Sequence, residues 1–285
     1  MPRARISALN VYPIKGCRGI ALPRARVAER GLTTAGPSAV AGDREWMIVD
    51  ADGRFVTQRE YPQLALIATS LAAGALVLAS PGMPSLCLPF EIPGLTLREV
   101  VVWNSQVTAH DAGDAAARWL SSAIGDDLRL VRFDPAGLRL CNPQYAGDSG
   151  AHTAFADGYP VLVIGEGSLN ELNARLAAKG IVALPMNRFR PNVVLAGLDP
   201  FDEDHVDTIS VDGVTLKLVK PCTRCQVTTT DQASAAVGTE PLATLAGFRM
   251  NTVLSGVTFG MNAIVVGGVG RELSVGADAD CRFAF

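Results

Sequence analysis

The chain has 285 residues, 48% of them hydrophobic and 19% charged, a composition that excludes a mostly disordered protein and suits one large domain or two small ones. Its formal net charge of −3 excludes a general basic binder of nucleic acid. Residues 1–30 are nevertheless locally basic, because they contain seven Lys and Arg residues and only one acidic residue, Glu29. This local charge suits either a small anionic ligand or a solvated basic surface.

The sequence shows no clear targeting or membrane segment. Pro13 and Lys15 interrupt the stretch after the basic N-terminus, which does not fit a signal peptide. Three prolines break the longest uncharged stretch, Tyr61–Phe90, and two buried strands around residues 72–74 account for it better than a membrane helix. Six cysteines without a secretory signal predict free thiols. We therefore expect a soluble, cytoplasmic protein with no membrane and no polymeric nucleic acid as partner.

Short apolar runs separated by glycine and proline, which number 28 and 17, predict many short strands. Trp46–Asp50, the turn Asp52-Gly53 and Arg54–Thr57 predict a β-hairpin. Val214–Leu218 alternates apolar and polar residues, which is typical of a half-buried strand. The other predicted strands are Ile6–Tyr12, Leu76–Ser80, Leu86–Leu88, Glu99–Trp103, Val161–Ile164, Asn192–Leu195, Asn262–Val266 and Leu273–Val275.

Two segments have apolar residues at helical spacing. One is Asp114–Ile124, and the other is Ser168–Lys179, which opens with a capping box formed by Ser168 and Glu171. Because strands outnumber helices, we predict a β-rich α+β fold with barrels or sandwiches and a few helices. The polar stretch Asp134–Gly150 is the softest candidate for a domain boundary.

Cys222 and Cys225 follow the alternating strand and Pro221, so we expect them on a connection into another strand. The neighbouring Lys220 and Arg224 would stabilise a thiolate and lower its pKa. A thioredoxin-like pair needs a helix within a βαβ unit, and a structural zinc site needs four ligands; neither pattern is present. Two interpretations stay open: one thiolate ligand to a soft transition metal, or two incidental cysteines.

Two further segments cluster cations. Lys15-Gly16 follows the first predicted strand and Arg44 lies in Gly42–Trp46, which suits a phosphate clamp but is neither a Walker loop nor a dinucleotide fingerprint. Met186–Asn192 places two arginines on either side of a phenylalanine before a Val-rich strand, which suits a polar anionic group. For each segment alone, ordinary surface Lys and Arg are the commoner explanation.

Taken together, these segments resemble the MOSC-domain family with an N-terminal β-barrel extension, and in particular its amidoxime-reducing branch. The resemblance extends over nearly the whole chain. The motifs that carry it are Val11-Tyr-Pro-Ile-Lys15, Gly42-Asp-Arg-x-Trp46, Val56-Thr-Gln-Arg59, Phe155-x-Asp157-x-x-Pro160, Phe189-Arg-Pro-Asn192 and Arg224-Cys225-x-x-Thr228-Thr-x-Asp231.

The resemblance implies an N-terminal β-barrel-like domain over residues 1–125 and a MOSC β-barrel domain over residues 126–285. It also implies a molybdenum–molybdopterin cofactor, with Cys225 as the protein thiolate on molybdenum. Lys15 and Arg44 match positions that hold the cofactor's phosphate, and Gly16 stands where relatives usually carry Ser. The other positions implied to bind the cofactor are Phe189, Arg190, Asn192, Thr223, Arg224, Thr228 and Asn262.

The activity that the resemblance implies is two-electron reduction of small N-hydroxylated compounds: amidoximes, hydroxylamines and hydroxylaminopurines. Cys225, Asp157 and Asp231 are the candidate catalytic residues, although Asp231 would serve equally well to orient the cysteine loop through backbone hydrogen bonds. Electrons would come from an external reductase, or from a ferredoxin-like or cytochrome-like protein. Two alternatives stay open: a carrier of the cofactor or of sulfur without turnover, and a β-rich binding module with free thiols.

Overall fold

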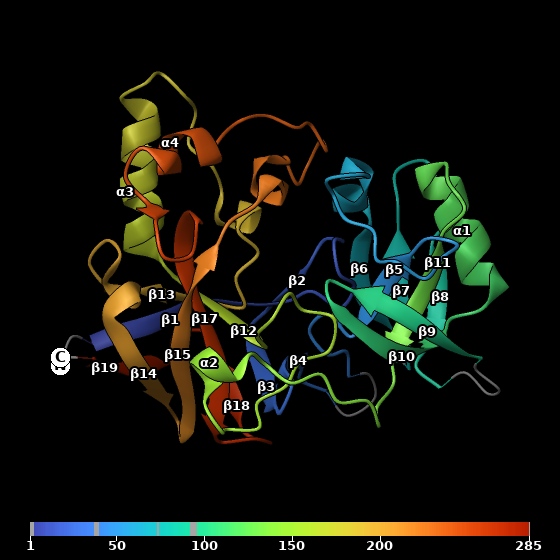
Figure 1. The fold of residues 1–285 in the computed structure, drawn as a ribbon, viewed down its shortest axis with the longest axis horizontal. Coiled ribbons are helices and arrows are strands. Elements are labelled where there is room, and N and C mark those ends of the chain that lie inside the picture. Colours follow the sequence, from blue (N-terminus) through green and yellow to red (C-terminus); the bar gives the residue numbers. More distant parts are fainter. Residues whose placement is uncertain (1–2, 37–39, 73, 92–95, 285) are drawn as a thin grey trace.

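The computed structural model describes residues 3–36, 40–72, 74–91 and 96–284. Its largest sheet closes into a barrel of seven strands, because β12 pairs with β13 on one side and with β17 on the other (left half of Figure 1). Around the barrel the strands are β12 (Val161–Gly165), β13 (Val193–Ala196), β1 (Arg3–Val11), β19 (Asp278–Phe283), β14 (Val206–Val211), β15 (Val214–Thr223) and β17 (Gly256–Gly267), with β2 (Ile20–Leu22) added to β1 and β16 (Met250–Asn251) to β17.

The first strand of the chain completes this barrel. β1 lies between β13 and β19, with Leu9 opposite Val193 and Ala4 opposite Ala279. A register shift between Ile6 and Ala8 lets both Ile6 and Leu9 point into the core, although they are three residues apart. The N-terminal segment is thus part of both halves, and the predicted boundary between residues 125 and 126 stays a prediction.

Two of the smaller sheets form most of the other half (right half of Figure 1), whereas the third contributes Ala25, Val27 and Leu32 to the core of the barrel. Helix α1 lies against β11 and β8, and its buried face shares a core with Trp46 and Leu64. The four-stranded sheet has the strand order β5 (Trp46–Val49), β11 (Arg129–Phe133), β10 (Ser105–Asp111) and β9 (Leu97–Val102). One three-stranded sheet has the order β6 (Ala68–Ala72), β7 (Ala75–Ala79) and β8 (Leu86–Pro89). The other has the order β18 (Glu272–Ser274), β3 (Arg24–Ala28) and β4 (Gly31–Thr34). The β-rich prediction is confirmed.

The helices are few, as expected. α1 (Asp114–Ile124) has the predicted bounds, because Gly113 and Gly125 take positive φ values at its two ends and the carboxylate of Asp114 suits its N-terminus. The remaining helices are α2 (Pro143–Ala146), α3 (Glu166–Ala177) and α4 (Leu242–Ala246), with 3-10 turns η1 (Pro62–Leu66), η2 (Met186–Arg188), η3 (Asp202–His205) and η4 (Gln226–Thr229).

The predicted capping box of the second helix is wrong. α3 starts two residues earlier than expected, with Gly165 as its N-cap and no side-chain cap. The Ser168 hydroxyl instead donates to the buried carboxylate of Glu203 and accepts the backbone N–H of Phe201. A tertiary contact therefore outweighs the local cap, because it satisfies a carboxylate that would otherwise be buried without partners.

Two other expectations near residues 50–90 have mixed outcomes. The uncharged stretch forms β6, β7 and β8, and no helix in the described ranges has the length and apolar character needed to cross a membrane. The turn at Asp52-Gly53 forms, with Gly53 at φ 76°. The expected second strand after it is wrong, because Arg54 pairs with Val101 of β9 and only Phe55 bridges back to Val49.

Candidate active site

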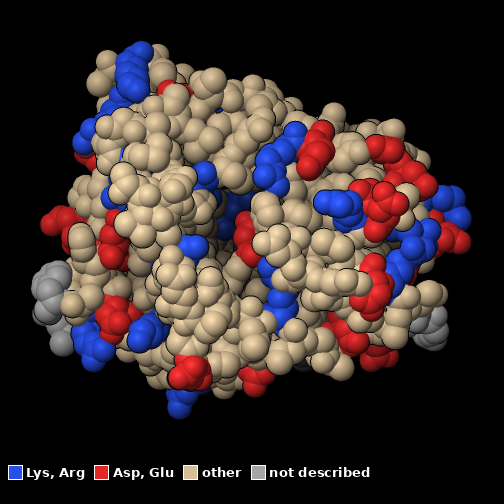
Figure 2. Space-filling view, viewed as in Figure 1, with Lys and Arg blue, Asp and Glu red and all other residues tan. Residues whose placement is uncertain are grey.

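Residues from both halves of the molecule line one cavity of about 140 Å³. Figure 2 shows it as a hollow in the middle of the face drawn, with Lys and Arg atoms on its wall. All eleven positions predicted to bind a cofactor line this cavity, as does Asp157, whereas Asp231 does not. The eleven are Lys15, Gly16, Arg44, Phe189, Arg190, Asn192, Thr223, Arg224, Cys225, Thr228 and Asn262.

Two arginines flank one tyrosine on the cavity wall. The guanidinium carbons of Arg44 and Arg190 both lie 4.3 Å from the centroid of the Tyr12 ring. Both arginines take positive φ values, 48° and 57°, a strained conformation that is typical of binding sites. Burial raises the pKa of Tyr12 to about 12. The sequence analysis assigns both arginines to the cofactor but gives no role to Tyr12, whose ring lies close to both cations.

The two arginines differ in their partners. Arg44 donates to the Asp43 carboxylate at 2.5 Å and to the carbonyl of Arg190. Arg190 is only 8% exposed, yet its guanidinium makes no hydrogen bond with any described residue, and its Nη2 is buried without a partner. Burial, reinforced by the charge of Arg44, lowers the pKa of Arg190 to about 10. Arg190 is therefore a buried cation with hydrogen-bonding capacity to spare.

Asn192 and Asp43 fix the position of Arg44. The amide nitrogen of Asn192 donates to Asp43 at 2.8 Å and to the carbonyl of Asn10, which uses both of its hydrogens. Its oxygen accepts the backbone N–H of Leu162. Although Asn192 lines the cavity, these hydrogen bonds connect β1 to β12. Its predicted binding to a cofactor stays a prediction.

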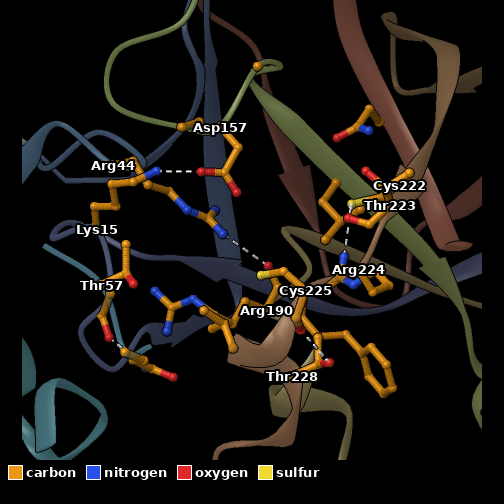
Figure 3. Close-up of a pocket in the computed structure, with 18 of the residues that line it drawn as sticks. Lys15, Arg44, Thr57, Asp157, Arg190, Cys222, Thr223, Arg224, Cys225 and Thr228 are labelled. Atoms are coloured by element: carbon orange, nitrogen blue, oxygen red, sulfur yellow. Dashed lines mark hydrogen bonds and ion pairs between the residues drawn. The ribbon is translucent and has the colours of Figure 1, made fainter. Parts of the chain in front are cut away.

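Lys15 and Asp157 form an ion pair at the cavity (Figure 3). The ammonium Nζ lies 2.5 Å from Asp157 Oδ1 and 2.9 Å from the carbonyl of Phe155. Burial lowers the pKa of Lys15 and would raise that of Asp157. The Lys15 ammonium and the Trp103 indole N–H outweigh burial and hold the pKa of Asp157 well below its usual range. At neutral pH Asp157 is therefore a carboxylate that accepts hydrogen bonds rather than a proton donor.

Arg139 stabilises the backbone segment that carries the acidic member of this pair. It is as buried as Arg190, but its Nη1 and Nη2 donate to the carbonyls of Ala154, Ala156 and Asp157. Arg139 thus fixes the backbone that carries Asp157. Sequence reasoning missed it, because it lies in a polar stretch with no motif around it and its partners are backbone carbonyls.

The segment that carries the two cysteines begins within a strand of the barrel rather than after that strand. β15 continues through Pro221 and Cys222 to Thr223, pairing with β17 across several register shifts, so the prediction that the strand ends before the cysteines is wrong. Cys225 is exposed and precedes η4, where the Thr228 hydroxyl donates to its carbonyl at 2.9 Å. Figure 3 shows Cys225 at the cavity.

The two cysteines are in different environments. Cys222 Sγ accepts the Nη1 hydrogen of Arg224 at 2.9 Å, and Arg224 Nη2 donates to the carbonyl of Phe189. Cys225 Sγ makes no hydrogen bond with any residue that the structure describes. The spacing of the two cysteines does not distinguish them, and only the resemblance singles out Cys225. The structure gives a polar partner to Cys222 and leaves Cys225 at the surface of the cavity.

Asp231 acts on the loop that follows the cysteines. Its Oδ1 accepts from the backbone and hydroxyl of Ser234 and from the N–H of Ala233, and its Oδ2 accepts from Arg188 at 2.8 Å. Arg188 lines the cavity and also holds the carbonyl of Thr229. These contacts match the alternative in which Asp231 orients the loop. The sequence pattern in Met186–Asn192 points to both Arg188 and Arg190, but the resemblance assigns only Arg190 to the cofactor.

A pair of buried glutamines joins the cysteine loop to the opposite wall. Gln58 and Gln232 exchange hydrogen bonds through their amides, at 2.9 and 3.2 Å. Gln58 also donates to the carbonyl of Gly16, which takes φ 85°, a value that favours glycine. The segments that carry Lys15 and Cys225 are therefore tied together through side chains that sequence patterns do not reveal.

Comparison with known proteins assigns both halves of the chain. Residues 3–127 match the family model described as MOSC N-terminal beta barrel domain, and residues 150–278 match the MOSC domain. Bovine mitochondrial amidoxime reducing component 2 is 34% identical over 250 residues, and human mitochondrial amidoxime-reducing component 1 is 32% identical over 250; each alignment covers 86% of this chain and 72% of the relative. The chain, which joins a MOSC N-terminal β-barrel domain to a MOSC domain, therefore belongs to the family of the amidoxime reducing components.

Proposed function

We propose that this protein reduces small N-hydroxylated compounds with a molybdenum–molybdopterin cofactor bound in the cavity. The names of the bovine and human relatives support reduction of amidoximes. One structural observation supports the cofactor: among the described residues, four of the nine buried polar side-chain atoms without a partner belong to residues that line the cavity. Arg188, Arg190 and Arg224 each contribute such a nitrogen, and Tyr159 contributes its hydroxyl.

These residues fit a pterin that carries a phosphate. A buried donor without an acceptor costs about 1–3 kcal/mol, so a ligand rich in anionic oxygens and ring acceptors would stabilise the site by pairing several donors at once. Arginine suits phosphate because its planar fork of N–H groups matches the phosphate oxygens. In this proposal Lys15, Arg44 and Arg190 hold the phosphate, and the thiolate of Cys225 binds the metal.

When bound, the cofactor would supply two-electron removal of an oxygen atom. Each N–OH group consumes two electrons and two protons and yields N–H and water. Asp157 orients the substrate: Oδ1 is held by Lys15 and Trp103, whereas Oδ2 accepts no hydrogen bond from the described residues and remains available to a substrate O–H or N–H. Because Asp157 is ionised at neutral pH, the protons come from solvent.

The electrons come from a separate donor protein, of reductase, ferredoxin-like or cytochrome-like type, and the word component in the relatives' names supports such an assembly. We assign the reaction to the cytoplasm. All six cysteines are free thiols in the structure, which suits a reducing compartment.

The decisive experiment is metal and pterin analysis of the protein purified from a host that makes molybdopterin. We expect molybdenum and pterin near one per chain, and reduction of benzamidoxime to benzamidine with reduced methyl viologen as artificial donor. Cys225→Ala should lose the metal and the activity together, because Cys225 is the thiolate proposed to bind molybdenum.

Two outcomes would contradict the proposal. Full activity in Cys225→Ser with metal still bound would exclude Cys225 as a necessary ligand. Rapid transfer of the cofactor to an apoenzyme, with no reduction of any amidoxime, would favour the carrier function instead.

A further inference from the structure

Trp103 occupies an unusual position for a large apolar residue. It lies at the turn between β9 and β10, its φ is 54°, and 42% of its surface is exposed. A positive φ is costly for a bulky residue, and exposure gives no burial energy in return. Strained and exposed residues of this kind concentrate where a ligand makes the missing contacts, so the surroundings of Trp103 decide what it does.

Those surroundings place the indole beside the cavity, because it is hydrogen-bonded to Asp157, which lines the cavity. Its Nε1 donates to Asp157 Oδ1 at 3.0 Å, across the junction between the two halves of the molecule. The Phe55 ring lies at a centroid distance of 5.0 Å, tilted by 54°, and the guanidinium of Arg59 lies 5.1 Å from the indole. Arg59 follows Thr57 and Gln58, both of which line the cavity.

The same contacts indicate which kind of ligand fits beside the indole. Asp157 offers one free oxygen beside the indole edge, because Lys15 and Trp103 share the other. A molecule that hydrogen-bonds to this oxygen through an N–OH or N–H group has its remaining atoms beside the indole. A flat ring conjugated to the reacting nitrogen stacks on an aromatic side chain, whereas a short alkyl group gains little there.

We propose that Trp103, together with Phe55 and Arg59, forms an aromatic wall that selects N-hydroxylated substrates whose reacting nitrogen is conjugated to a planar aromatic or heteroaromatic ring. This inference rests on the proposed function and adds the substrate class. Trp103 is a specificity residue from the N-terminal half of the chain, opposite the cysteine loop.

Steady-state kinetics of the cofactor-loaded protein with two matched substrates tests whether the aromatic wall selects substrates that carry a ring. For Trp103→Ala we expect the KM for benzamidoxime to rise roughly tenfold while the KM for acetamidoxime changes less than about twofold, because only the first has a ring to stack. Trp103→Phe keeps a ring and should hold the benzamidoxime KM within about threefold. Leu97→Ala, at the opposite end of β9 and also exposed, is the control and should change neither KM.

A binding measurement without turnover provides the second readout. Of the three tryptophans, Trp46 and Trp119 are buried at 1% and 8% exposure, so a ligand beside Asp157 quenches mainly Trp103. We expect saturable fluorescence quenching by benzamidine but not by acetamidine, and none in Trp103→Phe.

The outcomes separate this inference from the proposed function. Equal losses for both amidoximes in Trp103→Ala, or quenching by both amidines, would overturn the aromatic wall and reduce Trp103 to a support for Asp157. If the loaded wild-type protein reduces neither amidoxime, the proposed function fails, and benzamidine-selective quenching would still uphold the wall.

Discussion

Arg139 and Arg190 are equally buried, at 8% exposure, but Arg139 lies behind the segment that carries Asp157 and Arg190 lines the cavity itself. Arg139 donates to three backbone carbonyls. Arg190 makes no side-chain hydrogen bond with the described residues. Burial of a cation is costly in both cases, but only Arg139 offsets that cost within the protein. The difference separates a residue that holds the fold from one whose contribution depends on a ligand.

The two cysteines repeat this difference. Cys222 accepts a hydrogen bond from Arg224, whereas Cys225 has no such partner among the described residues and is exposed. At this site, whether a side chain has a hydrogen-bonding partner within the protein is thus a better guide to its function than its residue type or its burial. The predictions below test it, first on stability and then on activity.

Replacing Arg139 should have the largest effect on stability. Arg139→Leu leaves three carbonyls without their donor, and each unsatisfied buried group costs about 1–3 kcal/mol. We expect the free energy of unfolding to fall by roughly 3 kcal/mol or more, measured by urea denaturation. A loss below about 1 kcal/mol would show that water replaces the guanidinium and that Arg139 does not hold the fold.

Replacing Arg190 should have opposite effects on the two states of the protein. In Arg190→Leu the cofactor-free protein loses a buried, unpaired charge, so we expect it to gain about 1 kcal/mol, or about 2–4 °C in Tm. Retention of the cofactor should fall about 100-fold, because charge-assisted hydrogen bonds to phosphate are lost. Destabilisation as large as in Arg139→Leu would remove the distinction between the two arginines.

Asp157 should contribute a stability difference that depends on pH. Its pKa is lower in the folded protein than the ordinary value of 3.8, so its contribution is present above about pH 4 and is lost as the pH falls below that. We expect wild type to exceed Asp157→Asn in stability at pH 6 and the gap to narrow between about pH 5 and pH 3. A gap that widens in acid would show that the Lys15–Asp157 pair does not stabilise the fold.

Cys222→Ala should have the smallest effect. Because its thiol is hydrogen-bonded to Arg224, we expect the variant to keep its metal and to lose less than about threefold in amidoxime reduction. Molybdenum analysis next to Cys225→Ala gives the matched comparison. Loss of metal from the Cys222 variant would mean that both thiolates bind it.

The sequence predicts those features that depend on local patterns. Asp114–Ile124 is predicted with its observed bounds because glycines end it on both sides, and the alternation in Val214–Leu218 marks a strand of the barrel. The motifs also bring all eleven predicted cofactor positions to one cavity. For the helix and the strand, the signal lies within a few residues of the structure that it predicts, whereas the cofactor positions come from the resemblance, which extends over nearly the whole chain.

The features that the sequence does not predict depend on long-range contacts. Ser168 bonds to Glu203 instead of capping its helix, and β15 extends through a proline because β17 pairs with it. Trp103 is predicted only as the end of a strand, since nothing nearby in sequence indicates its bond to Asp157. Such side chains acquire their roles only from partners distant in the chain.

The position of β1 in the barrel also has a consequence for synthesis of the protein. A ribosome makes β1 first, but its two neighbours, β13 and β19, emerge only after about 190 and 280 residues have been translated. Until then β1 can pair only with the short β2, so most of its backbone has no partner strand, and closing so long a loop is slow. The nascent chain therefore exposes a largely unpaired apolar strand for much of its translation, and such strands are prone to aggregate.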